Sequence, residues 1–222
     1  MSHTHDSTLF TRIGLGLLAH LARQKAEAEP VVAADAKPAP AGRVVLVSSA
    51  RRGEGKSFVA QGLASALAEQ QDGDVVWVDA AFDTPPADSD ISRRGAAGLS
   101  EIMTLGSLQG LAPAGAGPER LWRLGRGVLA QPSLLYRPET VRRGLFALRA
   151  GFALTMLDAP CLESCGALLA EVDACVMVVD ARHTSRHVAR AALAKAGFGP
   201  ERLAGVVLNH RPRPVPRWLG GE

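Results

Sequence analysis

The sequence is poor in several residue types, and each shortage excludes a class of protein. It has no apolar run close to the roughly 20 residues that a membrane-spanning helix needs. Its cysteines, Cys161, Cys165 and Cys175, are odd in number and lack the paired spacing of a zinc site. We expect reduced thiols, as in a cytoplasmic protein. No signal-peptide pattern precedes an apolar stretch, so we expect a soluble protein that reaches a membrane only through a partner or a surface helix.

Lysine and tyrosine are also scarce. The 222 residues include one tyrosine and four lysines, and arginine supplies most of a formal net charge of +3. Such a mild excess predicts a mixed, solvated surface and no nucleic-acid partner. Hydrophobic residues make up 47% of the chain, which is enough for a full core and excludes a wholly disordered chain.

Composition divides the chain into four parts. Residues 1–28 form an expected N-terminal helical arm, and residues 29–42 an Ala/Pro-rich linker with too little apolar bulk to fold alone. The compact domain is expected over residues 43–212, followed by a C-terminal tail at 213–222.

The N-terminal arm has one apolar face at helical spacing. The residues on this face are Phe10, Ile13, Leu17 and Leu21. Gly14 weakens the helix prediction. Two alternatives remain for the face: it docks on a partner or membrane surface, or it packs on its own domain.

Within the expected domain, short apolar runs alternate with stretches of helical periodicity. We expect strands over residues 44–48, 75–78, 121–124, 153–157, 175–179 and 203–208. We expect helices over residues 57–70, 99–105, 141–148 and 186–194. This alternation predicts an α/β fold, a mostly parallel twisted sheet with helices on both faces.

The clearest motif follows the first of these strands. It reads Gly53-Glu54-Gly55-Lys56-Ser57, with Ala50 in place of the first glycine of the common pattern G-x-x-x-x-G-K-[ST]. Glycines let backbone N–H groups face inward, and the N-terminus of the following helix adds partial positive charge, so the motif predicts a phosphate cradle. Lys56 is predicted to reach the β- and γ-phosphates of ATP, and the Ser57 hydroxyl to bind Mg²⁺.

Two carboxylates close other strands of the predicted sheet. Asp79 follows the strand at 75–78, and Asp158 follows the strand at 153–157. At such positions a carboxylate can hold Mg²⁺ or orient the group that attacks the γ-phosphate, although either residue alone could merely cap a turn.

Residues 44–209 resemble the bacterial tyrosine kinases of capsule and exopolysaccharide biosynthesis, which are MinD/ParA-like P-loop ATPases. The matching motifs are Ser48–Ser57, Val75–Asp79, Gly98–Ile102, Leu157–Pro160 and Gly205–Asn209. The resemblance implies ATP and Mg²⁺ as cofactors. It implies that Lys56, Asp79 and Asp158 are catalytic, and that Ser57, Asp79 and Asp158 hold the metal. It also implies that the nucleotide contacts each residue from Gly53 to Phe58, and that Asn209 contacts the adenine base.

Two departures from this family bear on kinase activity. The family's A′ motif Asp-x-Asp-x-Arg reads Asp79-Ala80-Ala81-Phe82-Asp83 here, so its second carboxylate is missing. The tail lacks the family's tyrosine cluster, and the chain's one tyrosine, Tyr136, is expected to be structural. We therefore expect slow ATP hydrolysis with weak or absent transfer to tyrosine.

The resemblance implies an ATP-binding, kinase-like cytoplasmic protein at the inner face of the membrane. There it would act with a membrane polysaccharide co-polymerase or export protein, and a homo-oligomer stays open. One alternative is a ParA/MinD-type positioning ATPase, but Arg51 stands where those proteins have a signature lysine. The other is a catalytically silent pseudokinase scaffold, which Ala81 and the tyrosine-free tail favour.

Overall fold

The computed structural model describes residues 2–28, 41–82, 98–109, 118–128 and 136–211. Three features of the sequence fall outside these residues: the linker at 29–40, Asp83 of the A′ motif, and the tail at 213–222.

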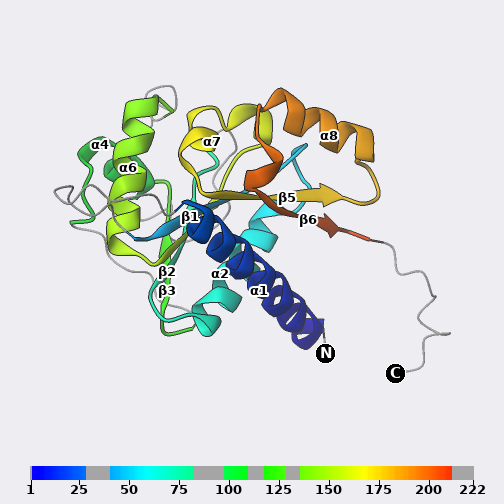
Figure 1. Cartoon of the computed structure of the whole chain (residues 1–222), viewed down its shortest axis with the longest axis horizontal. Coiled ribbons are helices and arrows are strands. Elements are labelled where there is room, and N and C mark those ends of the chain that lie inside the picture. The colour runs from blue at the N-terminus through cyan, green and yellow to red at the C-terminus, as the bar shows by residue number, and fades with distance from the viewer. Residues whose placement is uncertain (1, 29–40, 83–97, 110–117, 129–135, 212–222) are drawn as a thin grey trace.

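A parallel sheet forms the centre of the described chain (Figure 1). Its six strands lie in the order β3-β2-β4-β1-β5-β6, and every neighbouring pair is parallel. The strands are β1 (Arg43–Ser49), β2 (Val75–Asp79), β3 (Leu121–Leu124), β4 (Leu154–Asp158), β5 (Ala174–Asp180) and β6 (Leu203–Asn209). The predicted α/β fold is confirmed, and each predicted strand is present.

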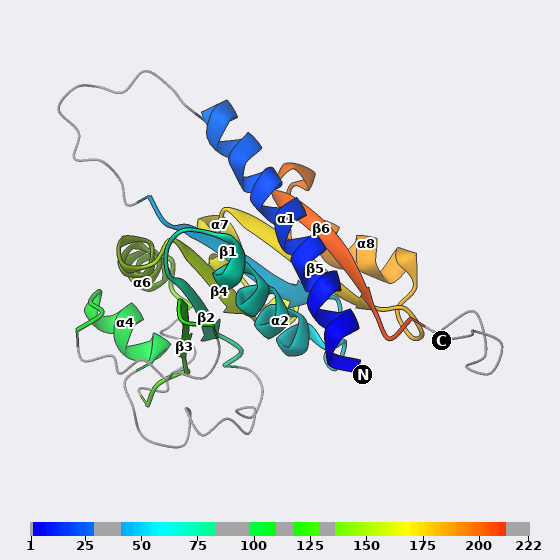
Figure 2. The same ribbon diagram turned by 90° about the horizontal axis from the view of Figure 1, so that it is seen from below.

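Helices cover both faces of this sheet (Figure 2). One face carries α1 (Ser2–Ala28) and α2 (Lys56–Gln70). The other carries α4 (Leu99–Leu105), α6 (Pro138–Gly151), α7 (Ala167–Glu171) and α8 (Arg186–Lys195). Alternate residues of β1 supply the two cores: Val44 and Leu46 face the α4–α8 side, and Val45 and Val47 face α1 and α2.

The predicted helices are all present, and within the described ranges three short elements were not predicted. These are α7 and two single turns of 3₁₀-helix, Leu162–Ser164 and Pro200–Arg202. Five residues or fewer do not span two helical turns, so they show no apolar period that a sequence could reveal.

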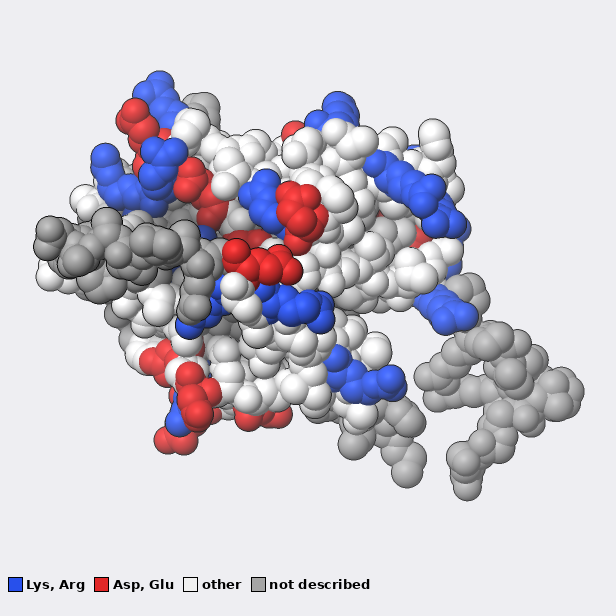
Figure 3. All heavy atoms as spheres, viewed as in Figure 1, with Lys and Arg blue, Asp and Glu red and all other residues white. Residues whose placement is uncertain are grey.

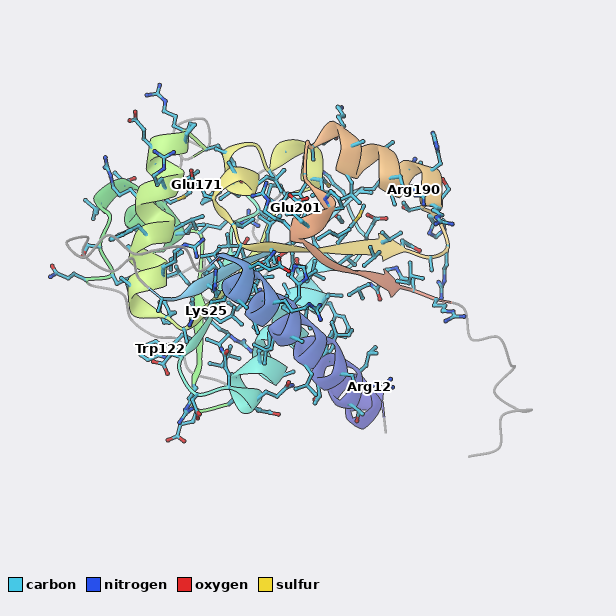
Figure 4. All side chains as sticks on the ribbon, in the orientation of Figure 1. Arg12, Lys25, Trp122, Glu171, Arg190 and Glu201 are labelled. Carbon is cyan, nitrogen blue, oxygen red and sulfur yellow. The ribbon has the colours of Figure 1, made fainter. Side chains whose placement is uncertain are left out.

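The N-terminal helix α1 packs on its own domain. Phe10, Leu17 and Leu21 are buried in the core that α1 shares with α2. Gly62 of α2 lets the Phe10 ring approach, because a Cβ there would overlap it. Other side chains of α1 are exposed, among them Arg12 and Lys25 (Figure 4) and the apolar Leu15. The structure thus shows the packing alternative for this face.

The surface and the thiols agree with the composition. Most of the viewed face is uncharged, with basic and acidic side chains side by side in several places and a row of basic groups near α8 (Figure 3). The three cysteines are buried thiols that form no disulfide. Among the described residues, no helix has both the length and the apolar character needed to cross a bilayer.

Candidate nucleotide site

The carboxyl ends of the strands bring the predicted site residues together. Asp79 ends β2 and Asp158 ends β4, and the two are direct partners in the register of these neighbouring strands. The glycine-rich loop follows β1 between β4 and β5, and Asn209 ends β6. This is the edge at which open parallel sheets bind their ligands.

The loop after β1 has the backbone of a phosphate cradle. Gly53 (φ 82°) and Gly55 (φ 84°) both adopt the left-handed conformation that glycine tolerates best. At Gly55 a side chain would also overlap the Asn209 amide. Lys56 then begins α2 and is buried. The first N–H groups of α2 have no partner further back in the helix and are therefore available to an anion.

The Glu54 side chain turns away from the cradle and holds the loop against β5. Its Oε2 accepts from the Arg51 N–H at 2.8 Å, and its Oε1 from the Asp180 N–H at 3.0 Å and the Thr184 hydroxyl at 2.5 Å. The Asn209 amide donates to the Glu54 carbonyl at 2.9 Å. Glu54 and Asn209 were both predicted to contact nucleotide, and the structure shows them bracing the loop that forms the cradle.

Phe58 lies on the outer face of α2. Its ring is exposed and meets the Phe10 ring of α1 edge to face, with centroids 5.5 Å apart. The ring therefore belongs to the contact between the two helices. The backbone N–H of Phe58 lies in the first turn of α2, directly after the cradle motif.

Asp158 has the properties of a metal ligand. Burial raises its pKa to about 6; a hydrogen bond with Ser57 lowers this pKa, while the nearby Asp79 raises it. Asp158 Oδ1 is one of the few buried side-chain atoms in the described residues without a hydrogen-bond partner. A buried oxygen of this kind next to a hydroxyl suits Mg²⁺, which prefers oxygen ligands and takes few from the protein. The Ser57–Asp158 pair therefore fits this ion.

Asp79 lies beside Asp158 but has partners of its own. Its Oδ2 accepts from Arg126 Nε at 2.8 Å, and its Oδ1 accepts from the Ala81 N–H at 3.1 Å. Arg126 follows β3 and is buried, and no sequence reasoning had singled it out. One signal could have found it: Arg126 also follows a predicted strand, between Gly125 and Gly127.

A second polar cluster lies next to the hydrogen bonds of Glu54. Asp180 Oδ2 contacts His183 Nδ1 at 3.1 Å and His210 Nδ1 at 3.0 Å, and Oδ1 accepts from the Arg182 N–H at 2.8 Å. The hydrogen bond with His183, followed by that from Arg182, holds the pKa of Asp180 well below its usual range. His210 itself has a left-handed backbone (φ 54°). The ends of β5 and β6 are thus linked beside Glu54.

Comparison with known proteins places this geometry among solved structures. The VpsO kinase domain superposes with a TM-score of 0.63 over 77% of this chain and 86% of its own, at 26% identity. The BceF tyrosine kinase domain superposes with a TM-score of 0.66 over 93% of this chain and 76% of its own, at 20% identity. The kinase domain of Escherichia coli ETK superposes with a TM-score of 0.63 over 79% of this chain and 71% of its own, at 18% identity. The chain has the fold of the bacterial tyrosine kinase domains.

This result confirms the resemblance predicted from the motifs. A ParA-family ATPase from Chlorobium tepidum superposes less well, with a TM-score of 0.51 over 77% of this chain and 85% of its own, at 16% identity. The wider MinD/ParA-like fold is therefore shared as well. No protein-family model matches the chain. No curated protein matches its sequence.

Proposed function

We propose that this chain is an ATP-binding, kinase-like P-loop protein that uses Mg²⁺ and hydrolyses ATP slowly. The observation that carries the proposal is the unpartnered Oδ1 of buried Asp158, a residue that is hydrogen-bonded to Ser57 of the cradle motif. A structural carboxylate would be expected to have its hydrogen bonds satisfied when buried. The unpartnered Asp158 Oδ1 therefore suggests a ligand that binds there together with the nucleotide.

Each residue of the cradle has a separate task in this proposal. The loop N–H groups and the N-terminus of α2 bind the phosphate oxygens, and Lys56 balances the charge of the β- and γ-phosphates. Ser57 and Asp158 would hold Mg²⁺. When bound, this ion neutralises charge on the phosphate oxygens. Glu54 and Asn209 keep the loop in shape through their hydrogen bonds within the protein.

Replacement of Lys56 tests the site. Lys56→Ala should abolish or severely weaken Mg-ATP binding in calorimetry, because the charge facing the phosphates is gone while the N–H groups remain. The matched control is Lys195→Ala, an exposed lysine that pairs with Glu163 at 3.2 Å. Equal affinity in wild type and Lys56→Ala would refute the site assignment.

We place the protein in exopolysaccharide or capsule-type biosynthesis, at the cytoplasmic face of the membrane, with a co-polymerase or export protein as its partner. The motifs at 48–57, 75–79 and 157–160 support this context, together with the similarity to the VpsO kinase domain. In a strain lacking the gene, polysaccharide output should fall, and Lys56→Ala should fail to restore it. Full restoration by Lys56→Ala would favour a silent scaffold.

One observation favours that second candidate, a scaffold without kinase activity. Tyr136 is half-buried and its hydroxyl donates to the Ala80 carbonyl at 2.9 Å, so the chain's one tyrosine is not presented for phosphorylation. Measurement of phosphate release separates the two candidates. Mg-ATP turnover lost in Lys56→Ala supports the ATPase, and nucleotide binding without turnover supports the scaffold.

A further inference from the structure

The loop that carries Arg126 is held in place by the start of α4. The Leu99 N–H donates to the Gly125 carbonyl at 2.9 Å, and the Ser100 N–H donates to the Arg126 carbonyl at 2.8 Å. Gly127 has a left-handed backbone (φ 87°), and a side chain there would overlap the Glu101 carboxylate. The segment that begins α4 is the Gly98–Ile102 motif, to which the proposed function gives no task. Its contacts set the direction of the Arg126 backbone.

From this loop Arg126 reaches Asp79 in the interior of the site. The Nε–Oδ2 distance is 2.8 Å, and the side chains of Arg126 and Asp79 are only 10% and 3% exposed. The other oxygen of Asp79 accepts from the Ala81 N–H. Both carboxylate oxygens therefore have donors from the protein. A buried ion pair of this kind is costly to break from one side, because the remaining charge loses its partner.

Asp158 differs from Asp79 although the two are register partners. Its hydrogen bond comes from Ser57, and its Oδ1 has no partner within the described residues. Of the two neighbouring carboxylates, Asp79 is thus paired with the Arg126 cation, whereas Asp158 has an oxygen that can still take a ligand.

We propose that Arg126 is a positioning residue that keeps Asp79 as its ion-pair partner, so that Asp158 and Ser57 alone take the metal. The Gly98–Ile102 motif acts on the nucleotide site through this arginine. Asp79 then serves to hold a cation beside the phosphates and is not a ligand of Mg²⁺. The inference rests on the proposed function, because it divides the tasks of the same site.

Calorimetry with ATP tests the division, with each variant measured in Mg²⁺ and in EDTA. The ratio of the two affinities gives the contribution of the metal, which a purely structural residue would not change. Asp79→Asn should keep this ratio within about threefold of wild type, whereas Asp158→Asn should lose it. A ratio lost equally in both variants would overturn the proposal.

A double-mutant cycle tests the ion pair itself. Arg126→Gln should weaken Mg-ATP binding by about tenfold or more, because an uncovered Asp79 repels the phosphates. The double variant Arg126→Gln/Asp79→Asn should recover most of this loss, since it has no unpaired charge. The matched control is Arg120→Gln, which breaks the exposed Arg120–Asp72 pair of 3.4 Å at the start of β3.

The outcomes separate the inference from the proposed function. Wild type that binds no ATP refutes the proposed function. Binding in wild type without recovery in the double variant refutes the inference alone, and so does an unchanged affinity in folded Arg126→Gln. Melting curves identify variants that fail to fold. If Arg126→Gln is one of them, the metal ratio of Asp79→Asn still decides.

Discussion

Asp79 and Asp158 are register partners on β2 and β4, yet their surroundings differ. Arg126 neutralises Asp79, while burial raises the pKa of Asp158 from 3.8 to about 6. For an acid, a raised pKa means that the folded state holds its proton more tightly than the unfolded state does. Asp158 therefore costs stability when ionised. The full cost is present above about pH 6 and is gone below about pH 4.

This sign gives a prediction for the metal-free protein. Near pH 8, Asp158→Asn should raise the free energy of unfolding by up to about 3 kcal/mol and the melting temperature with it. This gain should shrink toward pH 4. Melting curves in EDTA across this range measure it, with exposed Asp72→Asn as the control. A gain that is equal at every pH would contradict the assigned cost. With Mg-ATP present the order should reverse, because wild type binds Mg-ATP more tightly than Asp158→Asn and gains more stability from it.

At the scale of elements, α1 is the part whose role the sequence left open. Its residues Leu17 and Leu21 are 2% and 5% exposed against the core around α2. A Cβ at Gly14 would have little room, because it would lie 3.2 Å from the Leu67 side chain of α2. The glycine that weakens the helix prediction thus brings the two helices close together.

Packing of α1 predicts a stability effect. Leu17→Glu/Leu21→Glu should lower the melting temperature of the isolated protein by several degrees or more, because each change buries a charge and removes core volume. Leu15→Glu is the control, since Leu15 lies on the same helix and is 55% exposed. An unchanged melting temperature together with lost partner recruitment would instead support docking.

At the scale of the whole molecule, the chain offers no tyrosine suited to phosphorylation within itself. The ring of Tyr136 packs edge to face on Phe82 at 5.9 Å, and its hydroxyl is bonded to the exit of β2. A tyrosine acceptor would therefore have to lie outside these 222 residues.

After incubation with Mg-ATP, mass spectrometry of the protein should accordingly find no phosphotyrosine. The same incubation should show release of phosphate from ATP. Tyr136→Phe should leave phosphate release intact and lower the free energy of unfolding by about 1 kcal/mol, the usual worth of one hydrogen bond. Modification of Tyr136 in wild type, lost in Tyr136→Phe, would show that the residue is an acceptor and that the structural role is incomplete.

Local patterns determined much of this protein from the sequence by itself. The limits of β3 and α4 were predicted to the residue, and the other strands within two residues. This worked because strands of a buried parallel sheet are continuous apolar runs, and amphipathic helices repeat every 3.6 residues. The cradle was readable for the same reason: Gly53, Gly55, Lys56 and Ser57 are neighbours in the chain, and their chemistry depends on the local backbone.

Only the tertiary structure decided which side chains meet. Arg126 and Asp79 are 47 residues apart, and Glu54 and Thr184 are 130 apart. No local period records such pairs, because they depend on strand order and register. The sequence therefore predicted two similar carboxylates at strand ends, whereas the fold gave one an arginine and left the other open. The fold likewise buries the Glu54 side chain. It also packs α1 on α2, which the sequence left open because burial of an apolar face depends on what covers it.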